Sequence, residues 1–120
     1  MKTEFGFPPP EVWSENRAGS WRRNMRLHRE WADCAHLYWR ALPATVRERW
    51  PRPSRVHVTL TFPTQRRRDP HNYVGTVCKA IVDGLVHARV WPDDTAEWVT
   101  VMEPELRVGK PWVTVRLEAR

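Results

Sequence analysis

The chain has 120 residues, enough for one modest hydrophobic core, so we expect a single domain over residues 1–120. A formal charge of +6 and an isoelectric point near 10.1 favour a polyanionic partner, without separating DNA from RNA or an anionic membrane. No apolar run approaches the ~18 residues of a membrane span and no signal peptide is evident, so we expect no membrane partner. Cys34 and Cys78 fall at helical positions, which predicts reduced core thiols and a cytoplasmic location.

The first half of the chain is expected to form one long helix after a poorly patterned start. Residues 1–20 are predicted to be extended or partly ordered, with Phe5 and Phe7 in a short strand. From about residue 22 to residue 41, apolar side chains recur at helical spacing, which predicts a helix that Pro43 closes or follows with one short turn. The apolar stripe consists of Leu27, Trp31, Ala35, Tyr38 and Leu42.

Three strands are predicted in the second half. Residues 55–62 alternate between apolar and polar side chains, with Val56, Val58, Leu60 and Phe62 on the apolar side. The alternation returns in residues 98–102 and 112–117, and residues 109–111 supply a turn between them. The order helix, strand, helix, strand, strand predicts an α+β domain in which helices cover one face of a small mixed sheet.

A second helix is predicted to begin at Pro70. Proline fits the first helical position because it has no N–H to donate, and Asp69 before it is a natural N-cap. At about 100° per residue, one face of this helix carries a polar row and the opposite face is apolar. The polar row consists of Asn72, Thr76, Lys79, Asp83 and His87. Since the apolar face must pack on the core, we expect the row at the surface.

Acidic residues flank this row at both ends. The helix is expected to end near residue 88, and Asp93 and Asp94 follow soon after it. If the next strand brings the chain back, these carboxylates can approach Asp83 and Asp69. Close carboxylates repel unless a cation lies between them, so the cluster predicts a hard divalent ion, Mg²⁺, for which Mn²⁺ could substitute.

The order of these residues resembles the RusA-type Holliday-junction resolvases, small dimeric metal-dependent endonucleases often carried by phages and prophages. The resemblance covers roughly residues 56–117. It rests on the basic run Arg66, Arg67 and Arg68, then Asp69, Asn72, Lys79-Ala80, Asp83 with Leu85, and Trp91 followed by Asp93-Asp94. By this resemblance Asp69, Asp83 and Asp94 are the catalytic acids and metal ligands, Lys79 is the catalytic lysine, and Asn72 orients a ligand.

One position departs from the family pattern. Where the family usually has a second Asp two residues after the first, this chain has His71. An imidazole is a weaker magnesium ligand than a carboxylate and favours manganese or softer ions. We therefore expect His71 and Asp93 to assist the metal site rather than to form it. The seven-residue gap from Asn72 to Lys79 is also longer than in the best-known member of the family, yet it keeps both residues on one helical face.

The expected function is metal-assisted hydrolysis of phosphodiester bonds in branched DNA, in recombination or repair. The resemblance implies a homodimer that nicks two strands of a four-way junction in the cytoplasm of a bacterial host. Residues 66–68 and Lys79 are expected to contact DNA phosphates. The alternative is a branched-DNA-binding protein whose catalysis is weak or lost because of His71. A basic RNA-binding domain is disfavoured, because no RNP-like aromatic strand motif is present.

Each candidate also has a purely structural interpretation. Asp69 can simply cap its helix. Lys79 and Asp83, spaced i and i+4, can form an exposed ion pair. Asp93 and Asp94 after a proline can belong to an ordinary turn.

Overall fold

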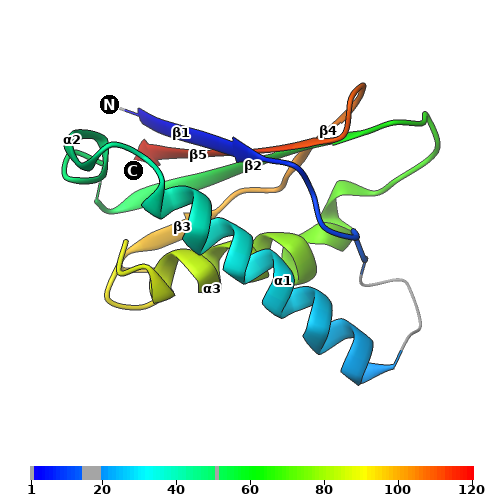
Figure 1. Ribbon diagram of the computed structural model, residues 1–120, viewed down its shortest axis with the longest axis horizontal. Coiled ribbons are helices and arrows are strands. Elements are labelled where there is room, and N and C mark those ends of the chain that lie inside the picture. Colours follow the sequence, from blue (N-terminus) through cyan, green and yellow to red (C-terminus); the bar gives the residue numbers. More distant parts are fainter. Residues whose placement is uncertain (1, 15–19, 51) are drawn as a thin grey trace.

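Helices α1 and α3 lie on one face of a five-stranded sheet in the computed structural model of the chain, and the other face of the sheet is open (Figure 1). The structure describes residues 2–14, 20–50 and 52–120. In chain order the elements are β1 (Lys2–Phe7), α1 (Trp21–Arg40), α2 (Ala44–Arg47), β2 (Ser54–Phe62), a 3₁₀ turn (Pro70–Tyr73), a π turn (Val74–Cys78), α3 (Lys79–His87), β3 (Val99–Val101), β4 (Glu105–Val108) and β5 (Trp112–Ala119). The predicted α+β class, a small mixed sheet with helices on one face, is confirmed.

Strand β2 is the centre of the sheet because it pairs with three other strands. Strand β5 runs antiparallel to it, from Ser54 opposite Ala119 to Thr61 opposite Trp112, and β1 pairs antiparallel with the far edge of β5. Strands β3 and β4 both run parallel to β2 and occupy successive stretches of its other edge. Along β2, buried and half-buried residues alternate, so one side of the strand faces the helices.

Buried aromatic side chains hold α1 on the sheet. Ser20 caps the helix by accepting a hydrogen bond from the Arg23 amide at 3.1 Å. Trp39 and Trp31 make edge-to-face contacts with Phe5 and Phe7 of β1. Such contacts add stability beyond the apolar area that they bury. The helix therefore has a fixed position from which its exposed side chains can reach α3.

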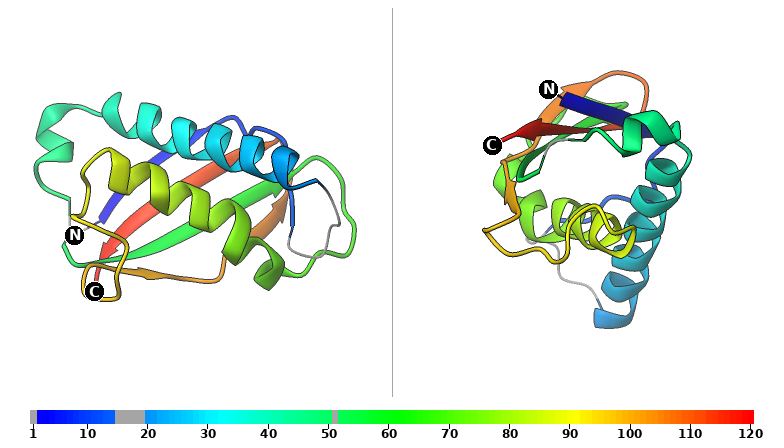
Figure 2. Two further views of the ribbon diagram at one scale, coloured as in Figure 1. Left: turned by 90° about the horizontal axis from the view of Figure 1, so that it is seen from below. Right: turned by 90° about the vertical axis from the view of Figure 1, so that its left-hand side faces the viewer.

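Helices α1 and α3 cross in close contact at Ala32 and Gly84. A Cβ built on Gly84 would lie 2.1 Å from the carbonyl oxygen of Ala32, so a glycine is required for this approach. The two helices run side by side over the sheet (Figure 2). The crossing therefore brings side chains near Ala32 together with side chains near Gly84.

The helix predicted to begin at Pro70 does begin there, but its first nine residues are not α-helical. They form the 3₁₀ turn and the π turn, and α3 starts only at Lys79. A count of 100° per residue does not hold through such segments. As a result Thr76 lies outside the polar row. It is buried, and its hydroxyl donates to the carbonyl of Trp13 at 2.9 Å. The prediction that Thr76 is presented at the surface is wrong.

Three smaller differences concern strands and the α1 stripe. Strand β4 is not predicted by the sequence, because most of its side chains are exposed and show no alternation. The strand predicted over residues 98–102 is shortened to β3. In α1, Trp39 is buried and Tyr38 of the predicted stripe is only half-buried, and Leu42, also half-buried, lies beyond the end of the helix.

The N-terminal prediction is confirmed in part. The strand expected around Phe5 and Phe7 is β1, whereas residues 1 and 15–19 of the expected extended segment lie outside the described residues. No helix in the described ranges is long and apolar enough to cross a lipid bilayer.

Candidate active site

Lys79 joins two of the predicted acids at the surface of the protein. Its Nζ donates to Oδ1 of Asp83 at 3.0 Å, one helical turn away, and to Oδ2 of Asp94 in the loop after α3. The three side chains are between 37% and 47% exposed, so solvent reaches all of them. Because both carboxylates bond to one ammonium, their nearest oxygens lie no more than about 6 Å apart, two hydrogen-bond lengths. The structure thus brings Lys79, Asp83 and Asp94 together, and we call these three residues the Lys79 cluster.

Lys79 and Asp94 keep their charges near neutral pH. The pKa of Lys79 is raised, first by its hydrogen bond to Asp94 and then by Asp83. The pKa of the Asp94 carboxyl is lowered by the same hydrogen bond and by the positive charge of Lys79. Each partner stabilises the charged form of the other. Lys79 and Asp94 therefore provide fixed charges rather than groups poised to exchange a proton.

Asp93 lies next to the cluster in sequence but is used differently. Its Oδ1 accepts a hydrogen bond from the Thr95 amide at 3.0 Å, which is the geometry of an Asx turn. The Thr95 hydroxyl and amide lower the pKa of Asp93. Asp93 thus shapes the loop that carries Asp94, and this position makes it a matched control for Asp94.

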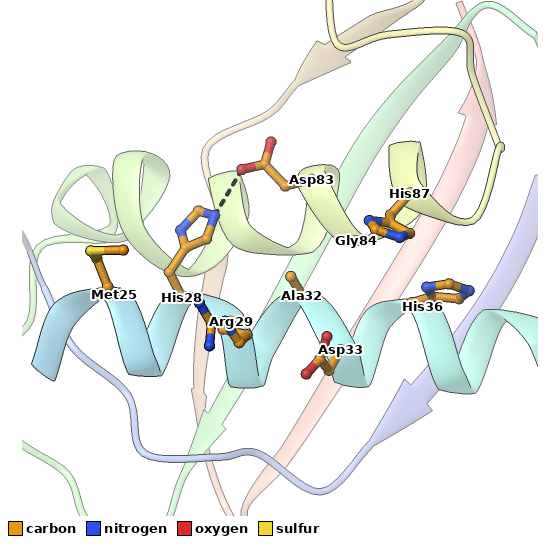
Figure 3. A pocket seen from close by; sticks show the side chains of 9 residues that line it. All are labelled: Met25, His28, Arg29, Ala32, Asp33, His36, Asp83, Gly84 and His87. Atoms are coloured by element: carbon orange, nitrogen blue, oxygen red, sulfur yellow. Dashed lines mark hydrogen bonds and ion pairs between the residues drawn. The ribbon is translucent and has the colours of Figure 1, made fainter. Parts of the chain in front are cut away.

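A histidine that the sequence analysis missed completes the surroundings of Asp83. Nε2 of His28 in α1 lies 2.7 Å from Oδ2 of Asp83, the oxygen that does not bond to Lys79 (Figure 3). His28 stands four residues before Ala32, and Asp83 stands directly before Gly84, so the close helix crossing sets this contact. No local pattern in the sequence pairs residues 55 positions apart. The one available signal is that His28 borders the buried stripe of α1.

The first predicted acid is not part of the Lys79 cluster. Asp69 caps the 3₁₀ turn, where its Oδ1 accepts from the His71 amide at 3.0 Å. The continuous helical run from Pro70 to Asp83 separates Asp69 from Asp83 by on the order of 20 Å at the rise of an α-helix. His71 is exposed and Asn72 half-buried at this same end of the run. The Asp69 carboxylate thus caps one end of the run, whereas Asp83 lies near its other end.

The donor set fits a hard divalent ion only in part. Asp83 and Asp94 offer carboxylate oxygens, the ligands that Mg²⁺ prefers. These oxygens point toward the Lys79 ammonium, which is itself a cation. Within residues 2–14, 20–50 and 52–120, no group of three or more His, Cys, Asp or Glu side chains is arranged to hold a metal ion. Two protein ligands are usual for Mg²⁺ when water and substrate oxygens complete its coordination.

The three arginines before Asp69 differ in their contacts with the rest of the protein. Nη1 of Arg68 donates to the carbonyl of Thr64 at 2.9 Å, and its guanidinium lies 3.9 Å from the centre of the Phe62 ring. Arg66 and Arg67 are exposed, and neither bonds to another described residue. Two of the three predicted phosphate-binding side chains are thus available to a partner, and the third holds the loop.

The two cysteines are free thiols, as predicted. Cys78 is buried, and its burial raises the pKa of its thiol to about 12. Cys34 is partly buried, and its pKa is also raised, first by desolvation. Neither thiol is poised to act as a nucleophile.

No family model matches this chain, and none of the curated proteins matches it either. The resemblance to RusA-type resolvases accordingly remains a prediction from the residues.

Proposed function

We propose that this chain is a metal-dependent endodeoxyribonuclease that acts on four-way and other branched DNA, of the RusA type. The observation that carries the proposal is the Lys79 cluster. A helix residue and a loop residue, 11 positions apart, place their carboxylates against one lysine at the surface of a basic protein. An ordinary exposed i,i+4 pair would account for Lys79 and Asp83, but not for the convergence of Asp94 on the same ammonium.

Asp83 and Asp94 would hold a Mg²⁺ ion, for which Mn²⁺ could substitute. A bound divalent ion supplies an activated water and neutralises negative charge on the reacting phosphate. Loading of the ion would release Lys79 from the two carboxylates, and its ammonium would then bind the attacked phosphate or the leaving oxygen. His28 would act as a positioning residue, since its hydrogen bond fixes the orientation of Asp83.

The surface of the chain suits a polyanion. The net charge is +6, and the exposed side chains of Arg66 and Arg67 offer charge-assisted contacts to phosphates. A homodimer would present two Lys79 clusters to one junction and cut two strands. Selectivity would then come from the branched shape more than from base reading.

The test compares two neighbouring aspartates on a labelled four-way junction with Mg²⁺ or Mn²⁺. We expect Asp94→Asn to lower the cleavage rate by at least about 100-fold, the scale of losing one electrostatic group in an active site. Asp93→Asn removes the same charge one residue away and should retain most of the activity. Junction affinity should be kept in both variants, because removing negative charge does not weaken a contact with a polyanion. Equal rates for Asp94→Asn and the parent would remove Asp94 from the site.

A second candidate, a branched-DNA-binding protein without cleavage, is favoured by one observation. The carboxylate of Asp69, expected to be a catalytic acid, caps its own helical turn and stands apart from the Lys79 cluster. The same assay separates the two functions. If the chain binds the junction but does not nick it with either Mg²⁺ or Mn²⁺, its function is binding of branched DNA without cleavage.

A further inference from the structure

The groove between α1 and α3 contains a second pair of facing side chains, His36 and His87. They lie on the opposite side of the Ala32–Gly84 crossing from His28 and Asp83 (Figure 3). His36 follows Ala32 by four residues and His87 follows Gly84 by three, so each ring projects from its helix toward the same groove. Their ring centroids are 5.3 Å apart, and the ring planes are inclined by 38°.

These two rings lack the kind of partner that His28 has. Nε2 of His28 lies 2.7 Å from a carboxylate oxygen of Asp83. Among the described residues, His36 and His87 make no hydrogen bond or ion pair to the protein, and their contact is with each other. Two imidazoles held side by side with unengaged nitrogens offer two lone pairs to one acceptor.

The spacing of the rings matches that of two imidazoles on one metal ion. A Zn–N bond is about 2.0–2.1 Å, and the centroid of an imidazole lies roughly 1 Å behind the ligating nitrogen, so two tetrahedral ligands have centroids on the order of 5 Å apart. The groove has a volume of about 430 Å³, which leaves room for water to complete the coordination. Asp33, three residues before His36 in α1, lines the same groove.

We propose that His36 and His87 form a binding site for one divalent transition-metal ion of the Zn²⁺ or Ni²⁺ class, which links α1 to α3. Imidazole nitrogens select these ions over Mg²⁺, which prefers oxygen ligands. The site is separate from the Lys79 cluster and does not depend on nuclease activity. Because the ion bridges two helices that are far apart in sequence, it binds the folded state and stabilises it.

Titration calorimetry on the full chain, with Zn²⁺ and separately with Ni²⁺, tests the site directly. We expect one ion per chain whose binding depends on His36 and His87, and a metal-dependent rise in melting temperature. His36→Ala and His87→Ala should each weaken binding by about 100-fold, since a bidentate site becomes monodentate and the advantage of a second tethered ligand disappears. Binding of Mg²⁺ should be the same in these variants and the parent.

Two control variants exclude other ligands. His57→Gln removes an imidazole from the open face of the sheet, and Cys34→Ser removes a partly buried thiol on α1. Both should bind Zn²⁺ and Ni²⁺ as the parent does. Unchanged affinity in His36→Ala and His87→Ala, loss of binding in Cys34→Ser, or no saturable binding by the parent would each overturn the proposal. In the last case the two rings only pack against each other.

Discussion

Lys79 and Asp94 give the candidate site a pH dependence whose sign follows from their shifted pKa values. The pKa of Asp94 is lowered in the folded chain. Its charge therefore contributes fully to the stability of the folded state above the pKa that Asp94 has in the unfolded chain, and this contribution is lost as pH falls through the lower folded pKa. The pKa of Lys79 is raised in the folded chain, so its charge contributes fully to the stability of the folded state below its unfolded pKa. This contribution is lost as pH rises through the higher folded pKa. The contact should thus persist from mildly acidic to strongly alkaline pH.

Replacement of the lysine tests this coupling. In Lys79→Met we expect the titration of the Asp94 carboxyl, followed by carbon-detected NMR, to move up toward its ordinary pKa of 3.8. The pKa of Asp93 is lowered chiefly by Thr95, so its titration should move much less and serves as the internal control. If Asp94 titrates identically with and without Lys79, the two side chains are not in contact in solution.

His28 provides a second test at the scale of single residues. We expect His28→Ala to lower junction cleavage and Mn²⁺ affinity by about 10- to 100-fold, as is typical when a hydrogen-bond partner of a metal ligand is removed. His28→Gln should restore part of both, because its amide can still donate to Oδ2 of Asp83. His57→Gln, on the open face of the sheet, is the matched control and should resemble the parent. If His28→Ala and His28→Gln lose cleavage and Mn²⁺ affinity equally, the hydrogen bond to Asp83 is not the cause of the loss.

At the scale of elements, the α1–α3 crossing determines which side chains can meet. Gly84→Ala would place a methyl group 2.1 Å from the backbone oxygen of Ala32, which cannot move aside as a side chain could. Alanine gains about 1 kcal/mol of helix propensity over glycine, but overpacking costs about 1–3 kcal/mol or more. For a clash with backbone we expect an overpacking cost at the upper end of this range. The free energy of unfolding should then fall by about 2 kcal/mol.

Urea unfolding measures this loss, with Gly109→Ala as the comparison. At Gly109 the nearest atom to a new Cβ is a side-chain methyl of Thr61 at 3.3 Å, so we expect a change within about 0.5 kcal/mol. A Gly84→Ala variant as stable as the parent would show that the helices separate at little cost.

The elements differ in how far the sequence could predict them. Strand β2 and helix α1 follow from apolar periodicity, since each buries one face against the core. The segment from Pro70 to Cys78 could be predicted as helical from its cap, but not as 3₁₀ and π turns, which depend on packing such as the bond from Thr76 to Trp13. The same limit applies to the site. Charge and spacing predict Lys79 with Asp83, whereas the partnership with His28 depends on a crossing that Gly84 permits.

At the scale of the whole molecule, the two faces of the sheet have different roles. Helices cover one face, and they carry His28, Lys79 and Asp83. The open face carries charged pairs, His57 of β2 with Glu118 of β5 and Arg116 with Glu118 within β5. Two exposed arginines without an internal partner, Arg66 and Arg67, lie in the loop between β2 and the 3₁₀ turn. We therefore expect the helical side and this loop, rather than the open face of the sheet, to meet a polyanion.

The salt dependence of junction binding tests which arginines bind the phosphates. We expect the double variant Arg66→Ala with Arg67→Ala to lower affinity at low salt and to flatten the plot of log affinity against log salt by about 0.9 for each phosphate that the variant no longer neutralises. Arg68→Ala removes the same charge from a side chain held by Thr64 and Phe62, so it should change the slope less and loosen the loop more. Fluorescence anisotropy with a labelled four-way junction between 50 and 200 mM salt, roughly the range over which such ionic interactions are screened, gives both slopes. A slope that is unchanged in the double variant and flattened in Arg68→Ala would reverse the assignment, and would place the phosphate on the guanidinium over Phe62.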